Sequence, residues 1–314
     1  MEANARWVAL TAVAPVAWGA NYFVTHEFLP ADHPLYGAAL RALPAGLVLL
    51  ALCRRRPHGA WWGRSAVLGL LNVSVFFFLV FTASQLLPTS VASTVMAVSP
   101  LIMMLAAWPL VAERPSVAHL AGAVTGLGGV CLMLLGGAGG ISMPGILASA
   151  AAVLVSSVGH VLAKRWNTAT ADAGVLASTA WQLTAGGLLL LPVAVAVEGA
   201  PPPVSPSALL AFCYVGLVAT ALAFAAWFAG LRRLPAGTVG LIGLLNPVTG
   251  VLLGTAVAGE VLTGRQLCGL ALVLGGVALG RPPGKGRQAS RPDRAASGRP
   301  DCGRRKAGRT GRSV

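Results

Sequence analysis

The chain has 314 residues, of which 56% are hydrophobic and only 10% are charged. A soluble globular protein has about a quarter of its residues charged, so this composition excludes a soluble protein and predicts an integral membrane protein. The formal net charge of +14 comes largely from the end of the chain, because 11 of the 23 basic residues follow Gly280.

Ten apolar runs follow one another from the N-terminus to Gly280. Each has about 20 residues, the length of a helix that crosses about 30 Å of hydrocarbon. The runs are uniformly apolar, without the alternation of a barrel strand, and a helix satisfies its backbone polar groups internally. The sequence therefore predicts an all-α integral membrane protein with ten transmembrane helices. Their expected ranges are Trp7–Thr25, Pro34–Cys53, Ser65–Leu86, Val91–Ala112, Val117–Leu135, Gly145–Ala163, Gly174–Val197, Ala208–Gly230, Gly237–Ala258 and Thr263–Gly280.

The stretch from Pro88 to Val130 occurs a second time, 147 residues later and without a gap. The chain has nine acidic residues in all, so a glutamate at the same place in both copies indicates an internal duplication. The matching residues are Pro88, Pro100, Glu113, Leu120, Gly122, Leu127, Gly128, Gly129 and Val130 in the first copy, and Pro235, Pro247, Glu260, Leu267, Gly269, Leu274, Gly275, Gly276 and Val277 in the second.

The basic residues of the loops predict the orientation, because cytoplasmic loops are enriched in Lys and Arg. With a cytoplasmic N-terminus, the inner loops hold nearly all of these residues and the outer loops only Arg265. Both termini are then cytoplasmic. Each copy contains five helices, an odd number, so the second copy is inverted relative to the first. The predicted units are residues 7–137 and 143–280 for the two repeats and 281–314 for the tail.

Polar side chains inside spans are costly and therefore mark candidate functional positions. We expect such residues to line a substrate cavity. The alternative for each is a hydrogen bond to a neighbouring helix. The candidates are Trp18, Asn21, Arg41, Asn72, His160, Trp181, Gln182, Tyr214 and Asn246.

Two of these candidates carry a more specific hypothesis. No acidic residue lies well inside a predicted span, so Arg41 either faces the cavity and attracts an anionic group of the substrate or extends toward the membrane surface. His160 lies about a turn inside its span. A histidine there can titrate near neutral pH, which makes it the candidate for proton coupling, and the alternative is a packed, neutral side chain.

Two prolines and two glutamates recur at matching places in the copies. Pro100 and Pro247 lie near the middle of their predicted helices, where proline removes a backbone bond. Matching helix breaks indicate a site near the midplane of a transporter, and plain packing kinks are the alternative. Glu113 and Glu260 precede the next helix, where a carboxylate caps free backbone donors. We expect structural caps, and a role in gating is the alternative.

Other chemistries lack a matching pattern. The five cysteines are scattered singly, without the spacing of a metal site or a redox pair. Catalytic clusters such as H-E-x-x-H are absent from the sequence, so we expect no catalytic residues, no metal and no cofactor. A membrane-embedded enzyme or a scaffold without transport activity remains the alternative to a transporter. Nothing in the sequence indicates the oligomeric state.

The tail after Gly280 is rich in Arg, Pro, Gly and Ser, a composition that does not form a core and predicts disorder. On the cytoplasmic side, its basic residues would attract anionic lipids. The tail has no aromatic residue to stack on a base, so we do not expect it to bind nucleic acid.

Residues 7 to 280 resemble the EamA group of the drug/metabolite transporter superfamily. The resemblance rests on Trp18-Gly19-Ala20-Asn21, on Pro100 with Glu113-Arg114, and on the echo from Pro247 to Glu260 with Gly275-Gly276-Val277. It implies a secondary transporter in the cell (inner) membrane that exports small metabolites, amino acids or related compounds, by alternating access through a central cavity. The second copy departs from the pattern by having Glu260-Val261.

Overall fold

The computed structural model describes residues 2–87, 95–134, 142–169, 174–258 and 264–279. These residues form helices and contain no strands. The tail and Glu260 lie outside them. The helices are α1 (Glu2–Gly19), α2 (Asn21–Phe28), α3 (Pro34–Cys53), α4 (Trp61–Gly69), η1 (Leu70–Val75), α5 (Phe76–Leu86), α7 (Ser99–Val111), α8 (Val117–Leu134), α9 (Met143–Ala169), α10 (Val175–Glu198), α11 (Pro206–Cys213), η2 (Tyr214–Leu222), α12 (Ala223–Arg233), α13 (Ala236–Gly243), α14 (Leu245–Ala258) and α15 (Gly264–Leu279).

These elements confirm the predicted all-α architecture of ten membrane helices. Six helical stretches of the described chain are long and apolar enough to cross a membrane, and four shorter apolar helices occupy the remaining predicted spans. The third and eighth spans each combine three consecutive elements, over Trp61–Leu86 and Pro206–Arg233. The first span differs from the prediction, because a turn at Ala20 divides it into α1 and α2.

The π-helices η1 and η2 lie at corresponding places in the third and eighth spans, and their last residues, Val75 and Leu222, are 147 positions apart. In each, a hydroxyl donates to a carbonyl five residues earlier: Ser74 to Gly69 at 3.3 Å and Thr220 to Val215 at 2.7 Å. Such bonds match the wider π turn. Because π segments in helices often mark functional sites, their recurrence in both repeats directs attention to the residues around them.

The fourth and ninth spans are both interrupted. A turn at residues 97–98 precedes α7, in which Pro100 occupies the first turn. A turn at Leu244 separates α13 from α14, three residues before Pro247. Both interruptions lie just before a proline, whose ring fits the start of a helix and not its interior.

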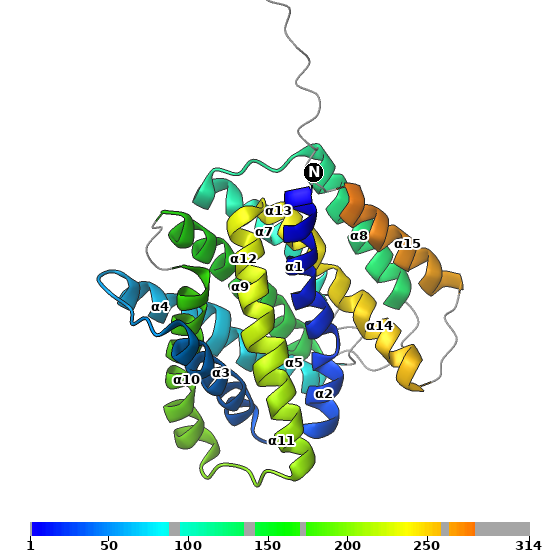
Figure 1. Ribbon diagram of the computed structural model, residues 1–314. Coiled ribbons are helices and arrows are strands. Elements are labelled where there is room, and N and C mark those ends of the chain that lie inside the picture. Colours follow the sequence, from blue (N-terminus) through cyan, green and yellow to red (C-terminus); the bar gives the residue numbers. More distant parts are fainter. Residues whose placement is uncertain (1, 88–94, 135–141, 170–173, 259–263, 280–314) are drawn as a thin grey trace, which may run out of the picture. The chain divides into compact units, whose positions relative to one another are not determined.

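Helices α8 and α15 lie side by side (Figure 1) because glycines let their backbones approach. A Cβ atom added to Gly276 would lie 2.5 Å from the carbonyl oxygen of Gly122, and one on Gly129 would lie 2.6 Å from that of Gly269. In lipid the hydrophobic effect does not hold helices together, so they associate through close van der Waals packing, which small residues permit. These four glycines are among the residues that recur in both copies of the duplication.

The surface of the described helices is strongly apolar. Large side chains such as Leu52, Val117, Val197 and Leu210 are at least two-thirds exposed. In water, contiguous apolar surface of this kind would drive association, whereas in a bilayer it contacts lipid chains. The helices of both repeats belong to one compact unit, Met1–Pro282, and the interior of this unit contains the polar residues that form the site.

Candidate functional site

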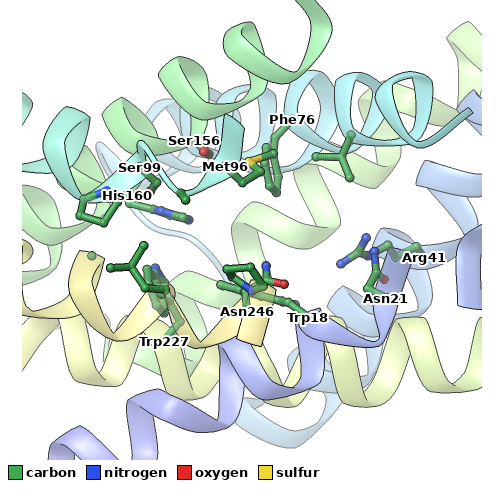
Figure 2. Close-up of a pocket in the computed structure, with 17 residues that line it drawn as sticks. Trp18, Asn21, Arg41, Phe76, Met96, Ser99, Ser156, His160, Trp227 and Asn246 are labelled. Atoms are coloured by element: carbon green, nitrogen blue, oxygen red, sulfur yellow. The ribbon is translucent and has the colours of Figure 1, made fainter. Parts of the chain in front are cut away.

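A cavity with a volume of about 90 Å³ lies where the interrupted helices meet. Figure 2 shows its lining, with Arg41 and Asn21 at one end, His160 and Trp227 at the other, and Trp18 and Asn246 between them. This volume is smaller than the roughly 300 to 1,000 Å³ of typical small-molecule sites, and the cavity wall combines polar and aromatic side chains.

Equivalent residues of the two repeats line this cavity. Five pairs, each separated by 147 residues, contribute to its wall. Four of them surround the helix interruptions. The pairs are Val80 with Trp227, Met96 with Gly243, Ala97 with Leu244, Ser99 with Asn246, and Pro100 with Pro247.

Arg41 lines the cavity from α3, and 8% of its surface is exposed. Its Nε donates to Thr220 Oγ1 at 2.7 Å, and its NH2 group donates to the carbonyl oxygen of Ala219 at 3.4 Å. The guanidinium carbon lies 4.1 Å from the centroid of the Phe77 ring, a cation–π contact. The π-helix η2 therefore supplies the acceptors that hold the guanidinium at the cavity wall.

Trp18 and Asn21 line the cavity from the first span, and Asn21 lies next to Arg41 (Figure 2). Trp18 Nε1 donates to the carbonyl oxygen of Ala219 at 2.8 Å, so the same η2 carbonyl holds both Trp18 and Arg41. The side chain of Asn21 is buried, and its Oδ1 has no hydrogen-bond partner among the described residues. This end of the cavity thus combines a positive charge with an available amide.

His160 lies at the opposite end, among aromatic rings. Its ring centroid lies 6.5 Å from that of Phe224, 5.6 Å from that of Trp227 and 5.5 Å from that of Phe228. Ser156, four residues earlier on the same face of α9, also lines the cavity. Among the described residues, no group of three His, Cys, Asp or Glu side chains is placed to hold a metal ion.

Four predicted candidates lie outside the cavity lining. Asn72 Nδ2 donates to Gln182 Oε1 at 3.0 Å, and both side chains are fully buried between η1 and α10. Trp181 Nε1 donates to the carbonyl oxygen of Arg55 at 2.8 Å. The hydroxyl of Tyr214 donates to the carbonyl oxygen of Ala17 at 2.8 Å. These four side chains therefore lie outside the lining of this cavity, and their polar groups connect neighbouring helices or loops.

Glu113 acts as a cap, but on a different helix from the one that the sequence suggested. Its Oε2 accepts from the backbone N–H of Ala236, the first residue of α13, at 2.8 Å. Its Oε1 lies 2.5 Å from Lys164 Nζ, which also donates to the carbonyl oxygen of Leu234 at 2.6 Å. Glu113 thus joins the first repeat to α9, α12 and α13 of the second.

The lining includes residues that the sequence analysis did not select, among them Phe76, Met96, Gly240 and Trp227. These are apolar residues or glycine and tryptophan, so a search for polar groups inside spans passed over them. The duplication contained a usable signal, because most lie at or near positions equivalent to a lining residue of the other repeat. For example, Met96 and Gly243 lie four residues before Pro100 and Pro247, and they are equivalent positions of the two repeats.

The chain was then compared with known proteins. The sequence profile of the EamA-like transporter family matches residues 5–135 and 143–280. Protein PecM of Dickeya dadantii (strain 3937) is 37% identical over 260 residues, which cover 83% of this chain and 87% of that protein. The aromatic amino acid exporter YddG of Ancylobacter novellus is 31% identical over 235 residues, 72% of this chain and 76% of that protein.

Two further similarities agree with this match. The uncharacterized inner membrane transporter YedA of Escherichia coli (strain K12) is 28% identical and covers 84% of this chain and 87% of its own length. A protein of known crystal structure superimposes with a TM-score of 0.72 at 26% identity, over 88% of this chain and 96% of that one. The duplicated membrane helices and the family match lead to one conclusion: the chain belongs to the EamA-like transporter family and is a membrane transporter of a small-molecule substrate, not an enzyme.

Proposed function

We propose that the chain exports small metabolites, amino acids or related compounds, by alternating access through the cavity between its repeats. The observation that carries this proposal is the lining itself, in which equivalent residues of both repeats meet at helix interruptions. In transporters with inverted repeats, substrate sites lie at such interruptions, and one repeat moves against the other around them. Two relatives are named for such a function: the aromatic amino acid exporter YddG and a probable amino-acid metabolite efflux pump of Salmonella typhimurium.

We further propose that Arg41 binds an anionic group of the substrate. The described lining contains no carboxylate, whereas the guanidinium lies at the wall with its Nε already bonded to Thr220. A substrate carboxylate would therefore pair with a charge that the fold has positioned. Hydrogen bonds to charged groups contribute about 1.5 to 3 kcal/mol, so losing the guanidinium would weaken binding roughly 10- to 150-fold.

The distribution of basic loop residues supports an orientation with both termini in the cytoplasm. The cell inner membrane is the proposed location, in agreement with the name of the relative YedA, an inner membrane transporter. A basic tail on that side would lie near anionic lipids and reinforce the orientation.

Transport is tested with the purified full chain in proteoliposomes, using a panel of labelled amino acids and small carboxylates under proton and sodium gradients. We expect flux of at least one anionic or zwitterionic solute. The Arg41→Gln variant should have a lower affinity for that solute. Arg64→Gln is the matched control, because Arg64 lies over Trp61 and Trp166 and does not line the cavity. No flux of any solute would overturn transport in favour of a scaffold. Unchanged affinity in Arg41→Gln would overturn the anion site alone.

A further inference from the structure

Three nitrogen atoms at one end of the cavity have no hydrogen-bond partner among the described residues: both ring nitrogens of His160 and Nε1 of Trp227. The two side chains are 6% and 3% exposed, and both line the cavity. Most buried polar atoms in proteins are paired, and an unpaired one is costly. The ring centroids of the two residues lie 5.6 Å apart, so the two rings are in contact.

Other buried polar atoms of the described chain also lack partners, among them Trp61 Nε1. Trp61, however, lies at the start of α4, outside the cavity lining. Trp18 lines the cavity but already donates to the carbonyl oxygen of Ala219. What distinguishes His160 and Trp227 is the combination of unpaired nitrogens, mutual contact and a place on the cavity wall.

The chemistry of the two rings defines the group that they can bind. An indole N–H only donates, whereas a neutral imidazole has one donor and one acceptor nitrogen. A hydroxyl can accept from Trp227 and either donate to or accept from His160, and a carbonyl oxygen can accept from both. A half-turn of the imidazole exchanges its nitrogen and carbon positions, which changes the atoms that face the cavity.

A second charged group of the substrate fits this end poorly. The permanent cation of the described lining, Arg41, lies at the opposite end (Figure 2). Around His160 the neighbours are the aromatic rings of Phe224, Trp227 and Phe228. A carboxylate buried there would lose its hydration without gaining a fixed opposite charge, so a neutral oxygen is favoured.

We propose that His160 and Trp227 form a second subsite, which binds a neutral hydroxyl or carbonyl oxygen at the end of the substrate opposite its anionic group. This inference rests on the proposed function. The rings of Trp18 and Phe76 line the cavity between the two ends, and they provide flat apolar surface for the body of the substrate. The substrate class is therefore a small acid with a flat apolar body and a distal hydroxyl or carbonyl group.

The test uses pairs of ligands that differ in one hydroxyl group: 3-phenylpropanoate with 3-(4-hydroxyphenyl)propanoate, and phenylalanine with tyrosine. Binding to the purified full chain and uptake into proteoliposomes are measured for all four. We expect the hydroxylated member of at least one pair to bind roughly tenfold more tightly, the effect of one or two neutral hydrogen bonds.

Variants assign the preference to the subsite. His160→Phe and Trp227→Phe should each bring the ratio between pair members close to one, because the hydroxyl of the hydroxylated member loses its partner. Trp61→Phe, the matched control outside the cavity, should keep the ratio. Arg41→Gln should weaken both members alike. Retained binding of the unhydroxylated member shows that a variant is folded.

The outcomes separate the subsite from transport. A ratio near one in the natural chain, or a ratio that persists in both His160→Phe and Trp227→Phe, overturns the subsite even where the ligands are carried. If all four ligands fail to bind while another solute is transported, the subsite is wrong and the proposed function stands. If no solute is transported at all, the proposed function is overturned as well.

Discussion

Replacing Glu113 with glutamine removes one negative charge from the junction between the repeats and keeps the shape of the side chain. Lys164 then loses the carboxylate that lies 2.5 Å from its Nζ and keeps the carbonyl oxygen of Leu234. The side chain of Lys164 is 9% exposed, so the ammonium remains largely buried without its counter-charge. The backbone N–H of Ala236 also faces a neutral acceptor instead of a charged one.

The magnitude follows from the burial of the two partners. Removing one partner of a buried pair costs about 3 to 5 kcal/mol, whereas an exposed pair contributes about 0 to 1 kcal/mol. The side chain of Glu113 is 32% exposed, so water screens part of the interaction. We expect Glu113→Gln to lower the free energy of unfolding by roughly 2 kcal/mol, between these limits.

Glu198→Gln is the matched control. The carboxylate of Glu198 accepts from the backbone N–H groups of Leu35 and Tyr36, at 2.6 and 2.9 Å, at the start of α3. It therefore caps a helix as Glu113 does, but its described contacts include no lysine. Its replacement should cost about 1 kcal/mol, because glutamine keeps an acceptor oxygen for one of the two N–H groups and loses the other.

The assay is unfolding of the purified protein in mixed micelles at pH 7 and low salt. The double variant Glu113→Gln/Lys164→Met removes the stranded ammonium, so its loss of stability should be smaller than the sum of the single losses. Equal losses in Glu113→Gln and Glu198→Gln, together with simple additivity in the double variant, would show that the ion pair does not stabilise the junction.

Three further predictions address helix packing, proton coupling and a candidate residue that lies outside the cavity lining. Gly276→Ala should destabilise the protein by roughly 1 to 3 kcal/mol, because its Cβ would meet backbone at 2.5 Å, whereas Gly275→Ala, with no atom within 4 Å, should be close to neutral in the same unfolding assay. His160→Gln should keep the pH dependence of transport in proteoliposomes, because the described contacts of the imidazole are aromatic rings and include no carboxylate; a flattened pH profile would restore proton coupling at this residue. Trp181→Phe should lose about 1 kcal/mol of stability with its hydrogen bond to Arg55 and leave the substrate affinity unchanged, since Trp181 does not line the cavity; a loss of affinity would contradict that placement.

The membrane spans could be predicted closely because the bilayer fixes both their length and their composition. Pro34–Cys53 agrees with the predicted range at both ends. The π-helices could not be predicted in this way, since their segments contain no proline and lie within continuous apolar spans. They depend on hydroxyl bonds such as that from Thr220 to Val215, whose donor residues are compatible with an ordinary helix as well.

Polarity inside a span located candidate residues but not their partners. Asn21 and Asn72 satisfy the same sequence criterion, yet Asn21 lines the cavity and Asn72 bonds to Gln182. The difference lies in how each helix is rotated against its neighbours, which is a property of the packed bundle. Glu113 shows the same limit, because the N–H that it caps belongs to Ala236, 123 positions away.

The duplication supplies the frame of the cavity, and the departures from it supply the chemistry. Pro100 and Pro247 are shared, so substitutions there should affect the movement that both repeats make. Val80 and Trp227 occupy equivalent places but differ in kind, and only the tryptophan offers a hydrogen-bond donor. Arg41 lies at the opposite end of the cavity from Trp227 (Figure 2). The two ends therefore differ in charge, although the repeats that form the cavity are related by inversion. A substrate with two different ends would therefore bind in one orientation, and substitutions at these unmatched positions should alter selectivity more than the transport rate.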